Sequence, residues 1–90
     1  MSGTPRHRPT VLDGVWVDPG LVRAQLGLTQ SEMAIAFGVT PNTWARWQRG
    51  VLAVHPAYQL LLELVERKAE RDPDRVAARL RAAGGVRNLW

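Results

Sequence analysis

The sequence predicts one small all-α domain, a compact arrangement of five helices. Apolar side chains recur at helical spacing in several segments, and most of these segments begin at a residue that caps helices well. Three of the helix starts place proline directly after the cap, where its missing N–H is harmless. They are Asp18-Pro19, Thr40-Pro41 and Asp72-Pro73. Ninety residues allow one small core and little more.

The first two helices are expected over residues 19–26 and from Gln30 to Gly38. The first begins at a capped proline, and a glycine ends it. The second begins with a capping box, in which Thr29 caps the helix and Glu32 reaches back to the cap. Gly38 ends it, because glycine accepts the left-handed conformation of a helix C-terminus at little cost.

The third helix is expected to start at Pro41, after the cap Thr40, and to end at Gly50. Three-residue spacing places Trp44 and Trp47 on the same side of this helix, and we expect both in the core. Aromatic stacking on single-stranded bases is the alternative role for such side chains.

The fourth helix is expected from about Ala57 to Glu70 and the fifth from Pro73 to about Ala83. Residues 51–56, between the third and fourth helices, are unusually apolar for a loop. Such a segment either tucks onto the core or forms a contact between subunits. The sequence leaves both open.

Residues 18–83 are therefore predicted to form the domain, with residues 29–50 as its central helix–turn–helix. Residues 1–17 are expected to be a flexible basic arm and lead-in, in which Val15 and Trp16 fold back over the domain. Residues 84–90 are expected to be a short tail, whose Trp90 is either loose or a docking anchor.

Composition argues against several classes of function. The chain has no cysteine, and its two histidines have no ligand-like spacing with any carboxylate, so we expect neither a metal site nor a cofactor. A nucleophile with a neighbouring base, a phosphate-binding glycine loop and clustered metal ligands are all missing, so we expect no enzyme. No apolar run approaches the ~20 residues of a membrane helix, and no signal-peptide pattern is present. We expect a cytoplasmic protein.

The charge pattern favours an anionic partner. The net charge is +4, and all but one of the basic residues are arginine. Guanidinium groups bind phosphates and guanine edges with a two-pronged geometry. Residues 40–50 contain Arg46 and Arg49 and no acidic residue, whereas the acidic residues of the second half lie mainly between Tyr58 and Arg75.

Residues 21–64 resemble the helix-turn-helix domain of the lambda-repressor-like (XRE-like) family, which includes phage Cro and repressor proteins. The matching pattern is Leu26-Gly27-Leu28-Thr29-Gln30, Glu32-Met33-Ala34, Phe37-Gly38-Val39-Thr40, Asn42-Thr43, Arg46-Trp47 and Gly50. The resemblance implies that the third helix enters the major groove of double-stranded DNA. It also implies that the family's apolar core positions are occupied here by Trp44 and Trp47.

The candidate DNA contacts follow from this resemblance and from side-chain chemistry. Asn42 carries the donor and acceptor that match adenine, Arg46 the fork that matches guanine, and Pro41 offers apolar contact alone. The alternative for Asn42 and Thr43 is capping of the helix, and for the arginines plain solubility. The expected base contacts are Thr40, Pro41, Asn42, Thr43 and Arg46; the expected phosphate contacts are Gln30, Arg49 and Arg23; and Arg6 and Arg8 of the arm are candidates for a minor groove.

The sequence departs from the family at one pairing. The family often joins an arginine of the first helix to a glutamate near the end of the third, and here Arg23 meets Gln48 instead. We expect a hydrogen bond to remain and the loss of the charge pair to leave Arg23 freer to contact a phosphate.

The function predicted from the resemblance is sequence-specific regulation of transcription. We expect a homodimeric repressor of a phage or bacterial promoter that binds an inverted repeat in double-stranded DNA. The alternatives are an antitoxin, which also neutralises a toxin protein, and a regulator associated with an anti-CRISPR gene. The apolar residues expected at the dimer contact are Leu52, Val54, Leu60, Leu64, Leu89 and Trp90.

Overall fold

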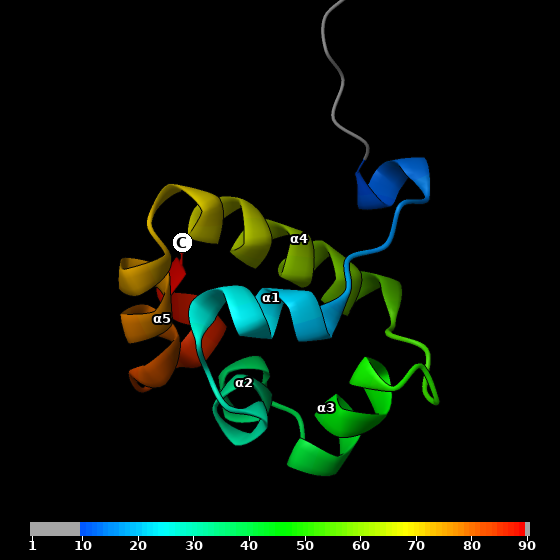
Figure 1. Ribbon diagram of the computed structural model, residues 1–90, viewed down its shortest axis with the longest axis horizontal. Coiled ribbons are helices and arrows are strands. Elements are labelled where there is room, and N and C mark those ends of the chain that lie inside the picture. The colour runs from blue at the N-terminus through cyan, green and yellow to red at the C-terminus, as the bar shows by residue number, and fades with distance from the viewer. Residues whose placement is uncertain (1–9, 90) are drawn as a thin grey trace, which may run out of the picture.

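The computed structural model describes residues 10–89 and confirms a compact all-α domain with five α-helices (Figure 1). Within those residues there is no strand. The helices are α1 (Pro19–Leu26), α2 (Gln30–Phe37), α3 (Pro41–Gln48), α4 (Pro56–Arg71) and α5 (Pro73–Arg81), and two 3-10 helices, η1 (Val11–Asp13) and η2 (Gly85–Leu89), flank them.

The predicted caps hold the helix starts in place. The Asp18 carboxylate accepts from the N–H of Gly20 at 2.8 Å, and the hydroxyl of Thr40 accepts from the N–H of Thr43 at 3.1 Å. Helix α4 begins at Pro56, one residue earlier than predicted, because the His55 side chain caps it. The His55 Nδ1 accepts from the N–H of Ala57 at 3.1 Å. Helix α5 ends at Arg81 rather than near residue 83, because the backbone of Ala82 is already extended.

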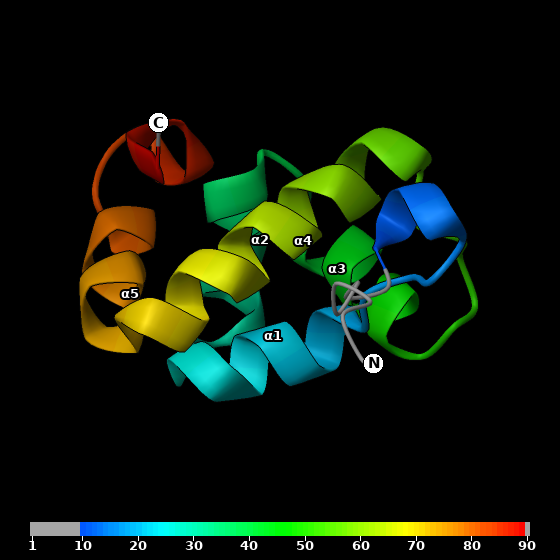
Figure 2. The same cartoon turned by 90° about the horizontal axis from the view of Figure 1, so that it is seen from above.

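The core lies between α4 and the other helices. Trp44, Met33 and Leu62 are fully buried, with no exposed surface. The rings of Phe37, Trp44, Trp47 and Tyr58 form a continuous row with centroids 5.0–5.7 Å apart, which joins α2, α3 and α4. Helix α4 runs across the domain in the view from above (Figure 2), and it packs against both α1 and α5. The prediction that both tryptophans belong to the core is confirmed.

The lead-in is not a free arm over residues 10–17. Residues 11–13 form η1, and the N–H of Val11 donates to the Glu63 carboxylate at 2.8 Å. Further along, the Gln59 amide accepts from the N–H of Val17 at 2.7 Å and donates to its carbonyl at 3.1 Å. The covering role expected of Val15 and Trp16 is met only in part, because about half of each side chain stays exposed. Arg6 and Arg8 lie outside the described residues.

The C-terminal residues are not a loose tail either. Residues 85–89 form η2, which packs against α2, α4 and α5. Val86 and Leu89 are buried in the core. The amide of Asn88 donates to the carbonyls of Arg79 and Ala83, at 2.8 and 3.1 Å, and so ties η2 to the end of α5. Trp90 lies outside the described residues.

Fewer of the side chains predicted at a dimer contact are available on the surface than the sequence suggested. Val54 and Leu89 are 4% and 5% exposed, so these two predictions are wrong: both side chains fill the core of their own chain. Leu52 and Leu60 are exposed and Leu64 is half-buried. The apolar loop after α3 packs onto the core in part, since Val54 is buried while Val51 and Leu52 stay exposed; the alternative of a contact between subunits stays a prediction. Within residues 10–89, no helix combines the length and apolar character required to cross a bilayer.

Candidate nucleic-acid interface

Helices α2 and α3 are joined by a three-residue turn, as the sequence predicted. Gly38 has a positive φ of 74°, which lets the chain reverse directly after α2. The N–H of Val39 then donates to the Ala34 carbonyl at 2.9 Å, and its side chain packs against the core. Thr40 begins α3 at once. The turn therefore fixes α3 beside α2, at the edge of the domain that Figure 1 shows at the bottom.

Helix α3 has two distinct sides. Trp44 and Trp47 are 0% and 6% exposed and anchor one side in the core. Pro41, Asn42 and Arg46 are exposed on the other. Because two large rings are fixed, the helix cannot rotate without opening the core. The outward direction of the polar side chains is thus determined by packing of the opposite face.

The threonines at the start of α3 already have partners. The Thr40 hydroxyl accepts from the N–H of Thr43 and donates to the Thr43 hydroxyl at 2.9 Å. Thr40 is exposed and Thr43 is half-buried. The residue that caps α3 is therefore Thr40, and the Thr43 side chain supports this cap by accepting from the Thr40 hydroxyl. Arg49 occupies the C-cap of α3, where its side chain is exposed.

Arg23 is held rather than freed. Its Nε donates to the Gln48 Oε1 at 2.8 Å, so the predicted hydrogen bond is present. Its Nη1 donates to the Leu28 carbonyl at 3.1 Å, and the residue is half-buried. The expectation that it becomes freer is wrong, because a backbone carbonyl and the glutamine replace the missing charge partner. The same Gln48 oxygen also accepts from the Trp44 indole at 2.6 Å, a contact that the sequence analysis missed.

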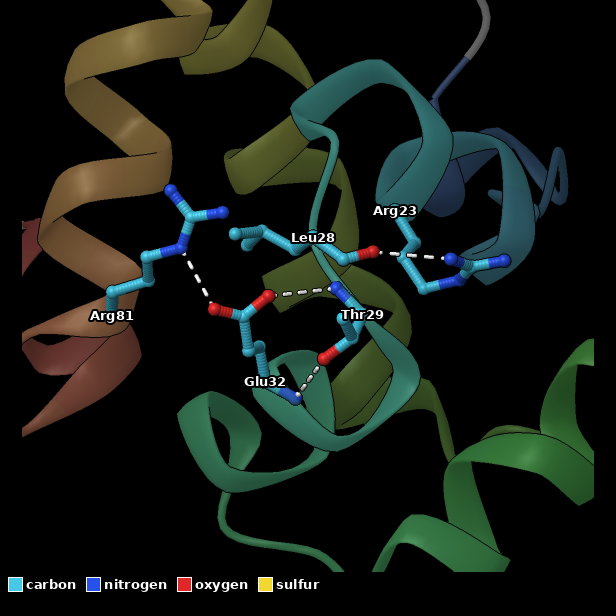
Figure 3. A network of polar contacts seen from close by, with 5 residues as sticks. All are labelled: Arg23, Leu28, Thr29, Glu32 and Arg81. Atoms are coloured by element: carbon cyan, nitrogen blue, oxygen red, sulfur yellow. Dashed lines mark hydrogen bonds and ion pairs between the residues drawn. The ribbon is translucent and has the colours of Figure 1, made fainter.

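The start of α2 carries a second polar network (Figure 3). Glu32 accepts from the N–H of Thr29 at 2.9 Å, while its own N–H donates to the Thr29 hydroxyl at 3.1 Å. Its other carboxylate oxygen forms an ion pair with Arg81 of α5 at 2.8 Å. The backbone N–H of Thr29 and then the guanidinium of Arg81 lower the pKa of the Glu32 carboxyl below its ordinary value.

This network determines the net charge at the start of α2. Gln30 is exposed in the first turn of α2, next to N–H groups whose dipoles favour negative charge. An acidic side chain in the same turn would repel a phosphate, but Arg81 offsets its charge. Arg81 was missed by the sequence analysis, since it lies 49 residues from its partner and no local pattern links the two.

The structure brings most of the predicted residues into two neighbouring elements. The exposed members on α2 and α3 are Gln30, Thr40, Pro41, Asn42, Arg46 and Arg49. Arg23 joins them through its hydrogen bond to Gln48, whereas the arm residues Arg6 and Arg8 lie outside the described part. Within residues 10–89 no group of three or more potential metal ligands comes together.

The fold thus defines a small helical domain with a helix–turn–helix. Comparison with known proteins adds one partial similarity. No family model matches the chain, and no solved structure matches it. The chain is similar to the type II methyltransferase M.MspI of Moraxella sp., with 37% identity over 43 residues. Those residues are 48% of this chain and 10% of the methyltransferase, so the chain matches about a tenth of that protein's length.

Proposed function

We propose that this protein is a sequence-specific regulator of transcription that binds double-stranded DNA, acting in the cytoplasm as a dimeric repressor of a phage or bacterial promoter. The observation that supports this most is the two-sided character of α3. Two tryptophans fix one side in the core, and the other side presents an amide and a guanidinium to solvent, with no acidic residue in residues 40–50. A major groove accepts one α-helix and is read by such groups.

In the proposed complex the first turns of α3 face the bases. Asn42 pairs with adenine and Arg46 with guanine O6 and N7, while Pro41 contacts a thymine methyl group. Gln30 and Arg49 bind phosphates on either side of the groove, and these contacts set the register of α3 without reading sequence. Arg23 reaches a phosphate with the N–H groups that Gln48 and Leu28 do not use.

A dimer follows from the small size of this reading surface. One helix reads only a few base pairs, and a two-fold dimer doubles that number at half-sites ~34 Å apart. Leu52 and Leu60 are 41% and 43% exposed, and Val51 is 71% exposed. These apolar side chains are the proposed contact between the two copies. Light scattering at micromolar concentration should then give twice the mass of one chain.

The test uses two arginines of the same helix. Selection from randomised duplexes supplies a preferred site, and binding is then measured on that site and on a scrambled one at several salt concentrations. Arg46→Ala should cost ~1–3 kcal/mol on the preferred site and much less on the scrambled site. Arg49→Ala should weaken both about equally and reduce the salt slope by about one per half-site.

A matched control is Arg87→Ala, since Arg87 is also exposed but belongs to η2. It should leave affinity and salt slope nearly unchanged. Equal losses on both duplexes for Arg46→Ala would reduce it to a phosphate contact. If neither Arg46→Ala nor Arg49→Ala lost affinity, α3 would not lie in the groove and the proposed function would fail.

A further inference from the structure

Positive charge also gathers in the described part of the chain away from α3. Lys68 and Arg71 at the end of α4, with Arg75 and Arg79 of α5, line one groove of about 290 Å³, which we term the α4–α5 groove. By comparison, α3 and its C-cap carry two cations. The proposed reading of DNA by α3 therefore leaves this cluster of four cations unused.

The four cations of the α4–α5 groove outnumber the carboxylates that line it. The ion pair between Arg81 and Glu32 involves none of them. Asp72 is the one carboxylate in the lining, and its Oδ1 already accepts from the N–H of Arg75 at 3.2 Å as the cap of α5. Glu70 and Asp74 belong to the same helices but do not line the groove. The lining thus holds an excess of positive charge.

The side chains of the groove are displayed outward. Arg71, Arg75 and Arg79 are exposed, and Lys68 is half-buried. Arg79 is also oriented, because its Nη1 donates to the Asn88 carbonyl of η2 at 3.0 Å. This arrangement suits an extended anion that runs over the surface. A pocket for a small ligand would instead enclose most of it.

The apolar content of the groove indicates which kind of extended anion fits. Val76 and Leu89 form its apolar part, but they are only 4% and 5% exposed. A protein partner gains much of its affinity from buried aromatic and aliphatic anchors, and the two apolar side chains of this groove expose too little surface to supply them. The phosphate backbone of a nucleic acid is bound chiefly through charge, by guanidinium groups above all.

The groove and α3 lie at opposite ends of the domain. Both views place α5 at one end and α3 toward the other (Figures 1 and 2). A duplex seated on α3 therefore leaves the α4–α5 groove uncovered. We propose that this groove binds the phosphate backbone of a second nucleic-acid segment, so that one domain joins two segments. This goes beyond the proposed function, but the joining of two segments rests on it, because α3 must hold the first one.

The test captures a second duplex with the full chain. A duplex that carries the complete inverted repeat is immobilised, so that both copies of α3 are occupied, and a fluorescent 20-bp duplex of random sequence is added. Arg75→Glu reverses one charge of the groove. Glu is well tolerated in the first turn of a helix, where negative charge is favourable, so we expect the variant to keep its fold. Arg87→Glu makes the same charge change in η2, outside the groove lining.

We expect Arg75→Glu to reduce capture of the fluorescent duplex at least ~10-fold near 0.1 M salt, while protein loading on the immobilised duplex changes less than ~2-fold. Arg87→Glu should retain capture. If four phosphates are neutralised, capture should fall on the order of 10²-fold between 50 and 200 mM salt. Equal capture by the two variants would overturn the proposal.

Competition experiments distinguish a nucleic acid from other anions that could occupy the groove. If poly-L-glutamate displaced the fluorescent duplex as well as an unlabelled duplex does, the groove would be a site for acidic protein. Displacement by about 1 mM pyrophosphate would make it a site for a small phosphate ligand. Either result overturns the proposal. Failure of the proposed function would appear separately, as unchanged loading by Arg46→Ala, and direct titration of the random duplex with Arg75→Glu tests the groove even then.

Discussion

Substitution of Gly85 tests how firmly the C-terminal residues dock on the domain. Gly85 has a φ of +54°, and a Cβ there would lie 2.6 Å from the Cα of Ala36 and 2.8 Å from its carbonyl carbon. Both atoms belong to the backbone of α2, so the overlap is relieved only if α2 or η2 moves. Gly38 is the matched control, since its φ is +74° but a Cβ there would meet nothing within 4 Å.

The expected magnitudes follow from this difference. Alanine in the left-handed conformation costs ~1–2 kcal/mol, which Gly38→Ala and Gly85→Ala share. Overpacking against backbone adds ~1–3 kcal/mol at Gly85 alone. The added cost has an upper limit, because η2 can detach instead. Detachment gives up the burial of Val86 and Leu89, ~1.5–3 kcal/mol for each side chain.

Urea unfolding followed by tryptophan fluorescence measures both variants. With a slope of 1–3 kcal/mol per M, the midpoint of Gly85→Ala should lie about 1 M below that of Gly38→Ala. Hydrogen exchange then shows which element moves, since detachment of η2 exposes the N–H groups that donate to the carbonyls of Ala82 and Gly84. Midpoints that agree within ~0.2 M would refute the close packing of η2 on α2.

Three further predictions concern stability. Trp47→Ala should cost ~3–5 kcal/mol in calorimetry or urea unfolding, since it removes a ring that is 6% exposed and contacts Trp44 and Tyr58; a variant that melts like the parent would contradict this. Gln59→Leu should cost ~1–3 kcal/mol through both hydrogen bonds to Val17, and exchange of the Val17 amide should rise while α2 stays protected. The Glu32 carboxyl has a lowered pKa in the folded state, so its contribution is present at neutral pH and is lost as pH falls below the ordinary glutamate range, about 4.3. Urea midpoints of the parent and Glu32→Gln should therefore differ at pH 7 and approach each other as the pH is lowered below the ordinary glutamate range, and a constant difference would argue against the Glu32 network.

Most helix boundaries could be predicted because their causes are local. A capping box such as Thr29 with Glu32 is complete within four residues, and a proline after a cap needs no distant partner. Helices α1, α2 and α3 begin where these signals place them. The start of α4 was misplaced by one residue because the cap is His55, whose ring nitrogen takes a role that serine, threonine, asparagine and aspartate usually fill.

The candidate site was predictable in part for the same reason. The spacing of Trp44 and Trp47 determines which side of α3 is buried, and therefore which side chains point outward. The binding partner of those side chains remains a proposal. For Arg23, the hydrogen bond to Gln48 was predicted from the resemblance, but the second acceptor, the Leu28 carbonyl in the loop after α1, was not. Local sequence shows that a glutamine is present but not that its oxygen also serves an indole.

The sequence by itself determined five helices, their order, their apolar faces and the turn between α2 and α3, since each depends on contacts within a few residues. Tertiary structure alone decided that residues 10–17 lie on α4, that residues 85–89 complete the core, and that Arg81 balances Glu32. It also gathered the cations of α4 and α5 into one groove. The physical reason is that hydrogen bonds, ion pairs and apolar burial between distant segments depend on distances in space, which the packing of the helices establishes.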